Sequence, residues 1–493
     1  MKKIVLLAAM LFISVIHIFG ITYYVSFLTG NDENSGTLPT TPWKTLGKIN
    51  GYEFLPGDSI LFKRGEIWRG QLISCSGAAT GYVTYSSYGN MKVPKPIIMG
   101  SVRWNLPEKW ENIQGNIWAT VIRKTQSNSG SENELNVDVG NIIFNNGEKC
   151  GVKVWDETSL DLQGKFWYDV DNKVVKLYSS VNPAKFYDNI ELALKHHIID
   201  QGNKNYIKYE NLDLRNGAAH GIGGGNVHHI IVKNCDLSFI GGALQAYNKN
   251  GKPVRYGNGI EFWGNAHDCY VINCKIGDVY DAAVTNQGGE NVTQYNIFYR
   301  NNIIWNSEYS FEYWLRNNST ASNIFFENNT CVNAGNGWGH NQRPDGHNGR
   351  HLMFYDNQAE VDNFYICNNI FSESTESALR ISKKWNGLTD LYLDHNLYFE
   401  SSGNVADWQG ISYSIEEFKK FQQDSGKDKF SIFADPNFID KSKFDYHLRK
   451  GSPAIDAGVD TVNLKNSYNK PKKAGSHYDI GAYTYLKHEK LAK

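Results

Sequence analysis

Six short segments of similar composition decide the fold: VKNCDL at 232–237, VINCKI at 271–276, YRNNII at 299–304, FENNTCV at 326–332, ICNNIF at 366–371 and LDHNLY at 393–398. Counting along the chain, their Asn residues at positions 234, 273, 301, 328, 368 and 396 are separated by 39, 28, 27, 40 and 28 residues. Three intervals therefore equal one unit of about 28 residues, and two equal that unit plus about a dozen.

Each unit contains short β-branched or aromatic runs broken by Asn and Gly, and none has a helical apolar period. A unit of this length cannot bury its own apolar face, so consecutive units must stack. The repeat predicts an all-β chain, a right-handed parallel β-helix. The side chains of five Asn residues are expected to bond the coils above and below them at one corner: Asn234, Asn273, Asn301, Asn328 and Asn368.

The interruptions of the repeat predict the domain organisation. Residues around Asp171-Asn172 read as a hairpin turn inside an inserted module, and Ser414–Glu417 is a capping box that opens a short helix. The expected parts are a signal peptide (1–20), an N-terminal cap with the first coils (21–100), an inserted small β module (101–195), the main β-helix coils (196–400), and a helical excursion, last coil and C-terminal cap (401–493).

The N-terminus and the composition bound location and partners. Met1-Lys2-Lys3 precede an apolar run that reaches Gly20, which is typical of a signal peptide and predicts a secreted or periplasmic protein. No later stretch predicts a membrane span. Lys+Arg 50 against Asp+Glu 51 leaves no basic field for nucleic acid or anionic lipid. Seven Cys residues, an odd number, exclude a fully paired disulfide framework. Aromatic residues make up 13% of the chain, which suggests stacking on sugars.

Two terminal phrases carry a family resemblance. The opening YYVS at 23–26 is followed by GND at 30–32 and Trp43, and the C-terminal region contains SPAIDAG at 452–458 and DIGA at 479–482. With the repeat, these phrases resemble the bacterial secreted right-handed parallel β-helix proteins found among carbohydrate-active enzymes. The resemblance implies the fold and a glycan substrate, and it leaves glycoside hydrolase and polysaccharide lyase both open.

The strands expected to follow the loop of each coil carry the candidate catalytic residues. GIEFWGN (259–265) and FEYWLRN (311–317) flank AAVTNQG (282–288) in the repeat. Alternation directs Glu261 and Trp263 outward from the first strand. It directs Glu312, Trp314 and Arg316 outward from the last. A carboxylate two residues before a Trp suits a glycan, because the acid serves the glycosidic oxygen and the indole covers the apolar face of the ring.

We therefore predict Glu261, Glu312 and Asp281, which precedes the middle strand, as catalytic residues. The alternative is that both Glu residues are ordinary solvated side chains. Because one strand intervenes, the backbones of Glu261 and Glu312 would lie two coils, or roughly 9.6 Å, apart. This separation favours an inverting hydrolase, although pairing with Asp281 would favour retention.

The two long coils owe their length to GALQAYNKNGKPVRYGN (242–258) and AGNGWGHNQRPDGHNGR (334–350). Both insertions precede a strand of the candidate sheet, so they would wall a groove whose floor includes Asn286. The alternative is that they are drifted surface loops. No His spacing suggests a zinc site. The predicted substrate-binding residues are Trp263, Asn286, Trp314, Arg316, Trp338, His340, Arg343, His347 and Arg350.

Three functions remain open on these residues. The favoured one is a secreted glycoside hydrolase that uses paired carboxylates and no cofactor. The second is a polysaccharide lyase acting by β-elimination on a uronate. Its charge neutraliser and its base would come from Arg316, Arg343, His340, His347, Lys383 and Tyr355, and Asp and Glu oxygens could bind Ca²⁺. The third is a non-catalytic glycan-binding β-helix. The expected partner is a polysaccharide or oligosaccharide, and the expected state is a monomer.

Overall fold

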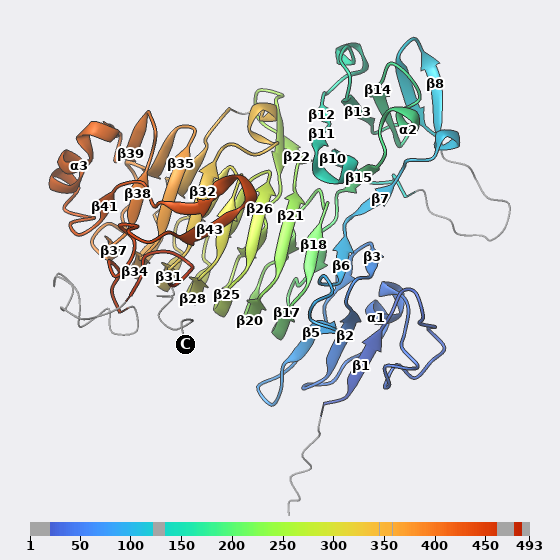
Figure 1. Cartoon of the computed structure of the whole chain (residues 1–493), viewed down its shortest axis with the longest axis horizontal. Helices are drawn as coiled ribbons and strands as arrows, with labels where there is room; N and C mark the ends of the chain where they lie inside the picture. Colours follow the sequence, from blue (N-terminus) through green and yellow to red (C-terminus); the bar gives the residue numbers. More distant parts are fainter. Residues whose placement is uncertain (1–19, 122–133, 345, 357, 461–477, 486–493) are drawn as a thin grey trace, which may run out of the picture.

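A computed structural model describes residues 20–121, 134–344, 346–356, 358–460 and 478–485. The predicted signal peptide lies outside the described residues, except for Gly20. The chain is a parallel β-helix, as predicted, with three long sheets running along its axis (Figure 1). Neighbouring strands in each long sheet come from successive coils and pair in parallel, apart from one antiparallel pair at the end of the third sheet.

The first sheet contains β1 (Thr22–Val25), β2 (Ser59–Lys63), β5 (Val83–Tyr88), β17 (Asn205–Glu210), β20 (Val227–Lys233), β25 (Ala266–Ile272), β28 (Thr293–Arg300), β31 (Thr320–Glu327), β34 (Glu360–Cys367) and β37 (Leu391–Asp394). The second contains β3 (Ile67–Arg69), β6 (Ile97–Met99), β18 (Asp213–Arg215), β21 (Asp236–Ile240), β26 (Lys275–Val279), β29 (Ile303–Trp305), β32 (Thr330–Ala334), β35 (Ile370–Ser374), β38 (Leu397–Phe399) and β41 (Ile432–Phe433).

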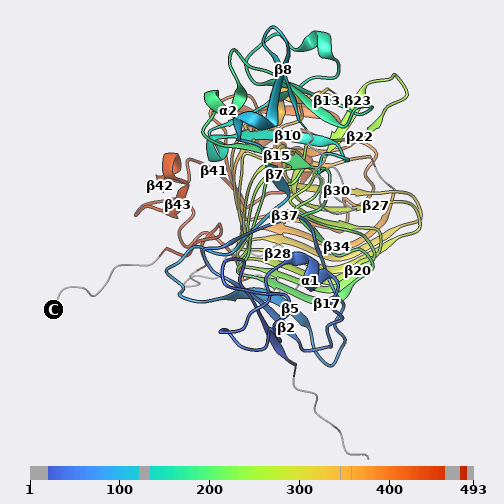
Figure 2. The same ribbon diagram turned by 90° about the vertical axis from the view of Figure 1, so that its right-hand side faces the viewer.

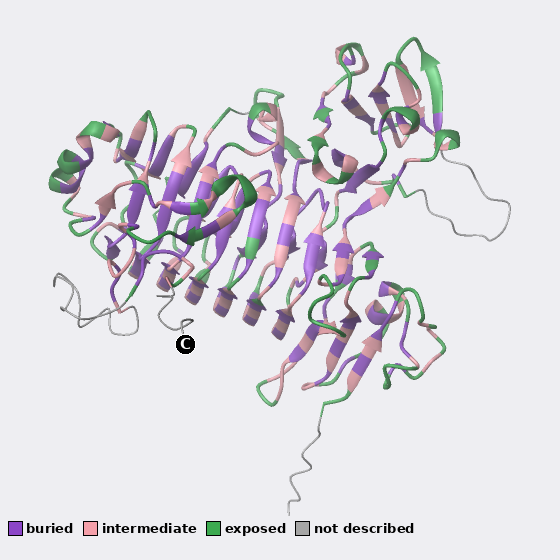
Figure 3. Ribbon diagram, in the orientation of Figure 1, coloured by how far each residue is buried: buried purple, intermediate pink, exposed green. Residues whose placement is uncertain are grey.

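The third sheet positions the candidate site. It contains β4 (Leu72–Ile73), β16 (Ile199–Asp200), β19 (Ile222–Gly223), β24 (Ile260–Trp263), β27 (Ala282–Gly288), β30 (Tyr309–Leu315), β33 (Arg350–Phe354), β36 (Ser377–Ile381), β39 (Asn404–Trp408) and β40 (Ile411–Ser414). Inward side chains such as Phe262, Phe311 and Tyr313 are fully buried. Figure 3 shows buried residues running through all the stacked strands, so the core is continuous along the coils.

The repeated Asn residues form the corner between the first and second sheets. Asn234, Asn273, Asn301, Asn328 and Asn368 adopt the left-handed conformation, with φ between 53° and 56°. Of the predicted ladder, the structure contains the bond that Asn368 donates to Asn328 at 3.4 Å. The longer ladder lies one residue further along the chain, because this conformation turns the chain and directs the next side chain inward. The buried ladder contains Asn302, Asn329, Asn369 and Asn396, and their amides bond coil to coil at 2.9–3.1 Å.

The described residues between 101 and 195 form two small sheets outside the coils. One contains β7 (Ser101–Arg103), β10 (Val139–Phe144), β11 (Lys149–Cys150) and β15 (Ile190–Leu194); the other contains β8 (Trp110–Gln114), β9 (Ile117–Thr120), β12 (Val152–Lys153), β13 (Lys165–Asp169) and β14 (Val174–Tyr178). The turn between β13 and β14 includes Asp171-Asn172. In Figure 2 this module and the hairpin β22 (Ala243–Tyr247)–β23 (Pro253–Tyr256) lie together at one edge of the coils.

The helices are few and short: α1 (Leu46–Asn50), α2 (Pro183–Phe186) and α3 (Phe418–Ser425). The capping box of Ser414 and Glu417 opens the helical segment that leads into α3. Phe421 of α3 is fully buried against Trp408, so the helix covers the end of the last coil. After α3 in the sequence, β42 (Phe438–Asp440) and β43 (Asp445–Leu448) form a two-stranded antiparallel sheet. Within the described part of the chain, no helix has the length and apolar character to cross a bilayer.

Candidate active site

A groove of about 850 Å³ lies over the third sheet at β24, β27 and β30. Glu261, Thr285 and Glu312 occupy the same register position on these three strands and point outward. The lining residues include Lys195, His197, His220, Gln245, Arg255, Asn258, Glu261, Trp263, Asp281, Gln287, Glu312, Trp314, Arg316, Arg343 and Tyr355. The groove therefore combines three predicted carboxylates with two predicted Trp residues.

Glu261 is a buried carboxylate held in its ionised form. Its Oε2 lies 2.6 Å from Nε2 of His220 and accepts a 3.1 Å hydrogen bond from the Asn258 amide. Burial would raise the pKa of Glu261, but His220 and Asn258 together lower it below its ordinary value. His197 stacks on His220 with ring centroids 4.9 Å apart, and burial lowers the pKa of His197 to about 4. Glu261 is thus an anion at neutral pH, available to accept a proton.

Glu312 has the opposite electrostatic environment. Its side chain is 4% exposed, and burial raises its pKa well above the ordinary value, with further raising from the negative charges of Asp281 and Glu261. Oε2 of Glu312 accepts a hydrogen bond from the Gln287 side-chain amide and another, at 3.4 Å, from the Thr285 hydroxyl. This upward shift favours the protonated form of Glu312, from which the carboxyl group can donate a proton within the groove.

Asp281 lies at the turn before β27 and pairs with Arg343 from the second insertion, whose Nη1 is 3.3 Å away. The same Nη1 donates to the Tyr280 carbonyl at 2.9 Å, and the guanidinium lies over the Tyr280 ring. Tyr355 closes this side of the groove, with its hydroxyl 3.1 Å from that of Tyr309. Arg343 therefore fixes Asp281 in place and ties the insertion to the carboxylate cluster.

The two outward indoles form an apolar wall on the other side. Trp263 and Trp314 have ring centroids 6.3 Å apart, and their planes are inclined by 51°. The Arg316 guanidinium lies 4.8 Å from the Trp314 ring centroid, within the range of a cation–π contact. Aromatic faces beside hydrogen-bonding groups are suited to the two kinds of surface on a sugar ring.

Asn286 does not belong to the floor of the groove. Its side chain is fully buried, donates to Gln294 at 2.9 Å and accepts from the Tyr299 hydroxyl at 2.8 Å. The register pairs Asn286 with Phe262 and Tyr313, which also face the core. The prediction is therefore wrong, because alternation along β27 directs the neighbours of Asn286 outward instead.

Four predicted residues of the second insertion and β33 lie away from the groove lining. The indole Nε1 of Trp338 donates to the Asp278 carbonyl at 2.8 Å, and Arg350 bonds Asp407 at 2.9 Å. His340 lies 3.0 Å from Glu308, and its ring packs against that of His347 at 4.4 Å. We predict from the sequence that Trp338, His340, His347 and Arg350 contact the substrate. The folded structure contradicts this, because these residues turn back onto the protein and do not line the groove. Asp345, in the same loop, lies outside the described residues.

Sequence reasoning missed several residues that complete the site. Asn258 and Gln287 hold the two candidate catalytic Glu residues. Glu308 accepts a 2.7 Å hydrogen bond from the backbone N–H of Asn348, which anchors the insertion. Gln287 could have been predicted from the sequence, because it occupies the same position in the repeat as the outward Trp263 and Trp314. Asn258 and Glu308 lie in turns, where strand alternation gives no direction.

Comparison with known proteins gives a short sequence match and a shared fold. No family model matches the chain. Over 84 residues the sequence is 39% identical to a lacto-N-biosidase of Bifidobacterium longum subsp. longum; the match spans 16% of this chain and 5% of that protein.

Similar solved structures have low sequence identity. A glycoside hydrolase aligns with a TM-score of 0.47 and 10% identity over 79% of this chain and 95% of its own. A lacto-N-biosidase from Eubacterium ramulus aligns with a TM-score of 0.33 and 13% identity over 84% of this chain and 67% of its own. A pectate lyase aligns with a TM-score of 0.37 and 12% identity over 95% of this chain and 98% of its own. Proteins named as hydrolases and proteins named as lyases both occur among these structures.

Proposed function

We propose that this protein is a secreted or periplasmic glycoside hydrolase that cleaves a polysaccharide or oligosaccharide without a cofactor. One observation carries the proposal: two carboxyl groups face the same groove with pKa values shifted in opposite directions, Glu312 upward and Glu261 downward. A protonated acid beside an ionised carboxylate is the pair that glycoside hydrolysis requires. The short match to a lacto-N-biosidase supports hydrolysis over elimination.

In the proposed reaction, Glu312 is the general acid and Glu261 the general base. Glu312 gives its proton to the glycosidic oxygen as the bond from that oxygen to the anomeric carbon breaks. Glu261 takes a proton from a water whose oxygen forms the new bond to the anomeric carbon. The net change is the addition of one water across the glycosidic bond, and proton exchange with solvent restores both groups. His220 keeps Glu261 ionised at the start of this cycle.

The stereochemical outcome follows from the strand spacing. Glu261 and Glu312 lie two coils apart in register, so their backbones are separated by roughly 9.6 Å. Carboxyl groups about 6.5–9.5 Å apart leave room for a water, which gives inversion of the anomeric configuration. We therefore favour inversion with Glu312 and Glu261. Retention would point to Asp281 as a partner of one of them.

The experiment compares Glu261→Gln and Glu312→Gln with Glu360→Gln, a control on an exposed position of β34. The two site variants are expected to lose about 10²–10⁴-fold in kcat, and the control to keep wild-type activity. Proton NMR of the first product identifies its anomer. A retained anomer would reject this pair, and full activity in both site variants would reject the site.

The cationic and aromatic side of the groove supports polysaccharide lyase as the second candidate. Arg316, Arg343 and Tyr355 could face a uronate carboxylate and its neighbouring C–H bond. Arg343, however, is already paired with Asp281, and burial raises the pKa of Tyr355, which disfavours a tyrosinate base. A new ultraviolet absorbance from an unsaturated product would establish the lyase, and binding without any product would establish a non-catalytic glycan-binding protein.

A further inference from the structure

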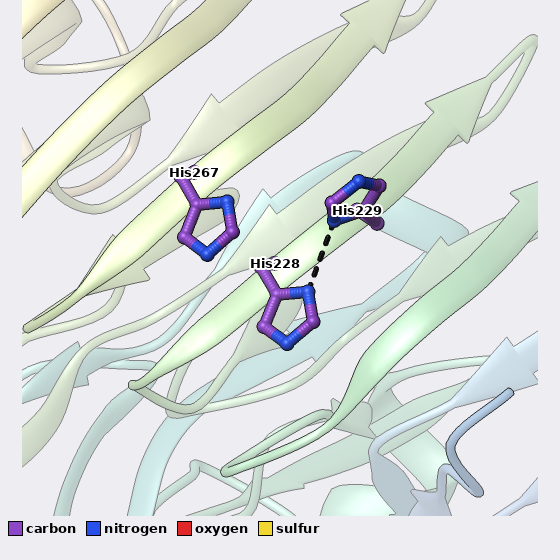
Figure 4. A group of neighbouring side chains, drawn as sticks. All are labelled: His228, His229 and His267. Carbon is purple, nitrogen blue, oxygen red and sulfur yellow. Dashed lines mark hydrogen bonds between the residues drawn. The ribbon is translucent and has the colours of Figure 1, made fainter. Parts of the chain in front are cut away.

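A cluster of three histidines lies on the first sheet, which is separate from the sheet that carries the groove. His228 and His229 are consecutive on β20, and His267 is on β25, the next coil (Figure 4). One ring nitrogen from each lies within 4.8 Å of the others, and Nδ1 of His228 is 3.0 Å from Nδ1 of His229. Three imidazole rings therefore lie together between two coils, and those of His228 and His267 stack in parallel with centroids 4.7 Å apart.

The backbone explains how consecutive residues can point to the same side. His229 adopts φ 54°, in the left-handed region, and this interrupts the alternation of β20. Accordingly, Val227 and Ile230 in β20 are buried, whereas His228 and His229 between them are both partly exposed. The same pattern recurs in β25, β28 and β31, where Asp268, Asn296 and Asn323 hold the left-handed position with φ of 52–54°.

The residue types in this row change where the histidines occur. In β28, β31 and β34 the left-handed position is Asn, a residue that tolerates the conformation well. In β17 it is Tyr206, in β20 it is His229 and in β25 it is Asp268. The coil accepts both Asn and Tyr at this position, so the fold does not itself require the potential metal ligands found in β20 and β25.

A carboxylate completes the arrangement. Oδ2 of Asp268 lies 2.8 Å from Nδ1 of His267 and 3.9 Å from Nε2 of His229, and its Oδ1 accepts a 2.9 Å hydrogen bond from Asn296. A carboxylate bonded to one nitrogen of a metal-binding His fixes the tautomer and leaves the other nitrogen free for the ion. The rings of His229 and His267 are 30% and 27% exposed, so an ion can reach them from solvent.

We propose that His228, His229 and His267 bind one divalent transition-metal ion, with Asp268 as orienting carboxylate or fourth ligand, and that the ion joins the coils of β20 and β25. Three neutral imidazoles favour Zn²⁺, Cu²⁺ or Ni²⁺ over Ca²⁺ or Mg²⁺, which prefer oxygen ligands. The role is structural, since the site bridges two neighbouring strands, and it does not depend on the proposed hydrolase activity.

The test uses Zn²⁺ with the mature chain carrying no affinity tag, by calorimetric titration and by thermal unfolding. We expect one Zn²⁺ per chain and a Tm that rises with Zn²⁺ and returns to the metal-free value with EDTA. The variants His229→Asn and His267→Tyr copy what β28 has at the same positions, Asn296 and Tyr295, so they should fold. Each is expected to weaken Zn²⁺ binding at least about tenfold, while the metal-free Tm stays the same or rises.

A second group of potential ligands, His340, His347 and Glu376, provides the control. His347→Asn should leave the Zn²⁺ affinity and stoichiometry unchanged. The proposal is overturned if the wild-type chain binds no Zn²⁺, if His229→Asn and His267→Tyr bind it as tightly as the wild type, or if His347→Asn alone removes binding. Loss of hydrolase activity in Glu312→Gln with Zn²⁺ binding intact would separate the two proposals.

Discussion

Single residues in the left-handed conformation control the direction of neighbouring side chains throughout the coils. At the corner, Asn301 and Asn328 turn the chain so that Asn302 and Asn329 point inward. On the first sheet, His229 in the same conformation directs two consecutive side chains to solvent. Asn is frequent at such positions because its short polar side chain tolerates positive φ. The repeated Asn thus marks a backbone conformation at every corner, and at Asn328 and Asn368 it also supplies a side-chain hydrogen bond.

The electrostatics of single carboxyl groups predict the pH dependence of activity. The proposed mechanism needs Glu261 ionised and Glu312 protonated, so kcat/KM should be bell-shaped. Because Glu261 has a lowered pKa and Glu312 a raised one, activity should fall at acidic pH as Glu261 gains a proton and at alkaline pH as Glu312 loses one. His220→Asn removes the main group that lowers the pKa of Glu261, so the acidic limb should move to higher pH.

The control for this measurement is His447→Asn, an exposed His paired with Asp445 in β43. Its pH profile should match that of the wild type. An acidic limb that stays in place in His220→Asn would show that the limb does not report Glu261, and the assignment of Glu261 as base would then fail.

At the scale of strands and loops, the regular elements were predictable and the course of the long insertions was not. The interval of about 28 residues gave the coils because a β-helix must return to the same sheet after each turn. Alternation gave the outward direction of Glu261 and Glu312, since the pleat of a strand fixes it. Trp338 and His340 were misplaced because no periodicity governs a loop, which here folds back onto Asp278 and Glu308.

The ladder between coils gives a prediction at this scale. Asn329 is fully buried, and its amide donates to the Tyr299 carbonyl at 3.0 Å and to Asn369 at 3.1 Å. It also accepts from Asn302. Asn329→Ala leaves these partners unsatisfied, so the free energy of unfolding should fall by about 2–4 kcal/mol in urea titrations. Asn301 lies at the exposed corner and has φ 56°. Asn301→Gly should therefore change the free energy of unfolding by less than about 1 kcal/mol. Equal losses in the two variants would contradict a special role for the buried ladder.

Over the whole molecule, the inserted module, the β22–β23 hairpin and the second insertion meet at the groove. Asp138 and Lys153 of the module form a buried ion pair at 2.6 Å, and Asp138 also accepts a 2.7 Å hydrogen bond from the Leu244 amide in the hairpin. Gln342 of the second insertion donates to the Gly151 carbonyl at 3.0 Å. Three segments distant in sequence thus support one wall, which no single repeat could have predicted.

This junction predicts the effect of Asp138→Asn. Burial lowers the pKa of Lys153 to about 8, and Asp138 is the main group that opposes this lowering. Without Asp138 the Lys153 ammonium is buried with little compensation, so the module should lose about 3–5 kcal/mol of stability near neutral pH. The folded pKa of Lys153 then falls below about 8, so the loss should shrink as pH rises through about 8, above which Lys153 is neutral in both folded proteins. Differential scanning calorimetry from neutral to alkaline pH measures this, with Asp138→Asn/Lys153→Met expected to restore much of the stability. A loss that is independent of pH would mean that the hydrogen bond to Leu244, rather than the charge of Lys153, holds the wall together.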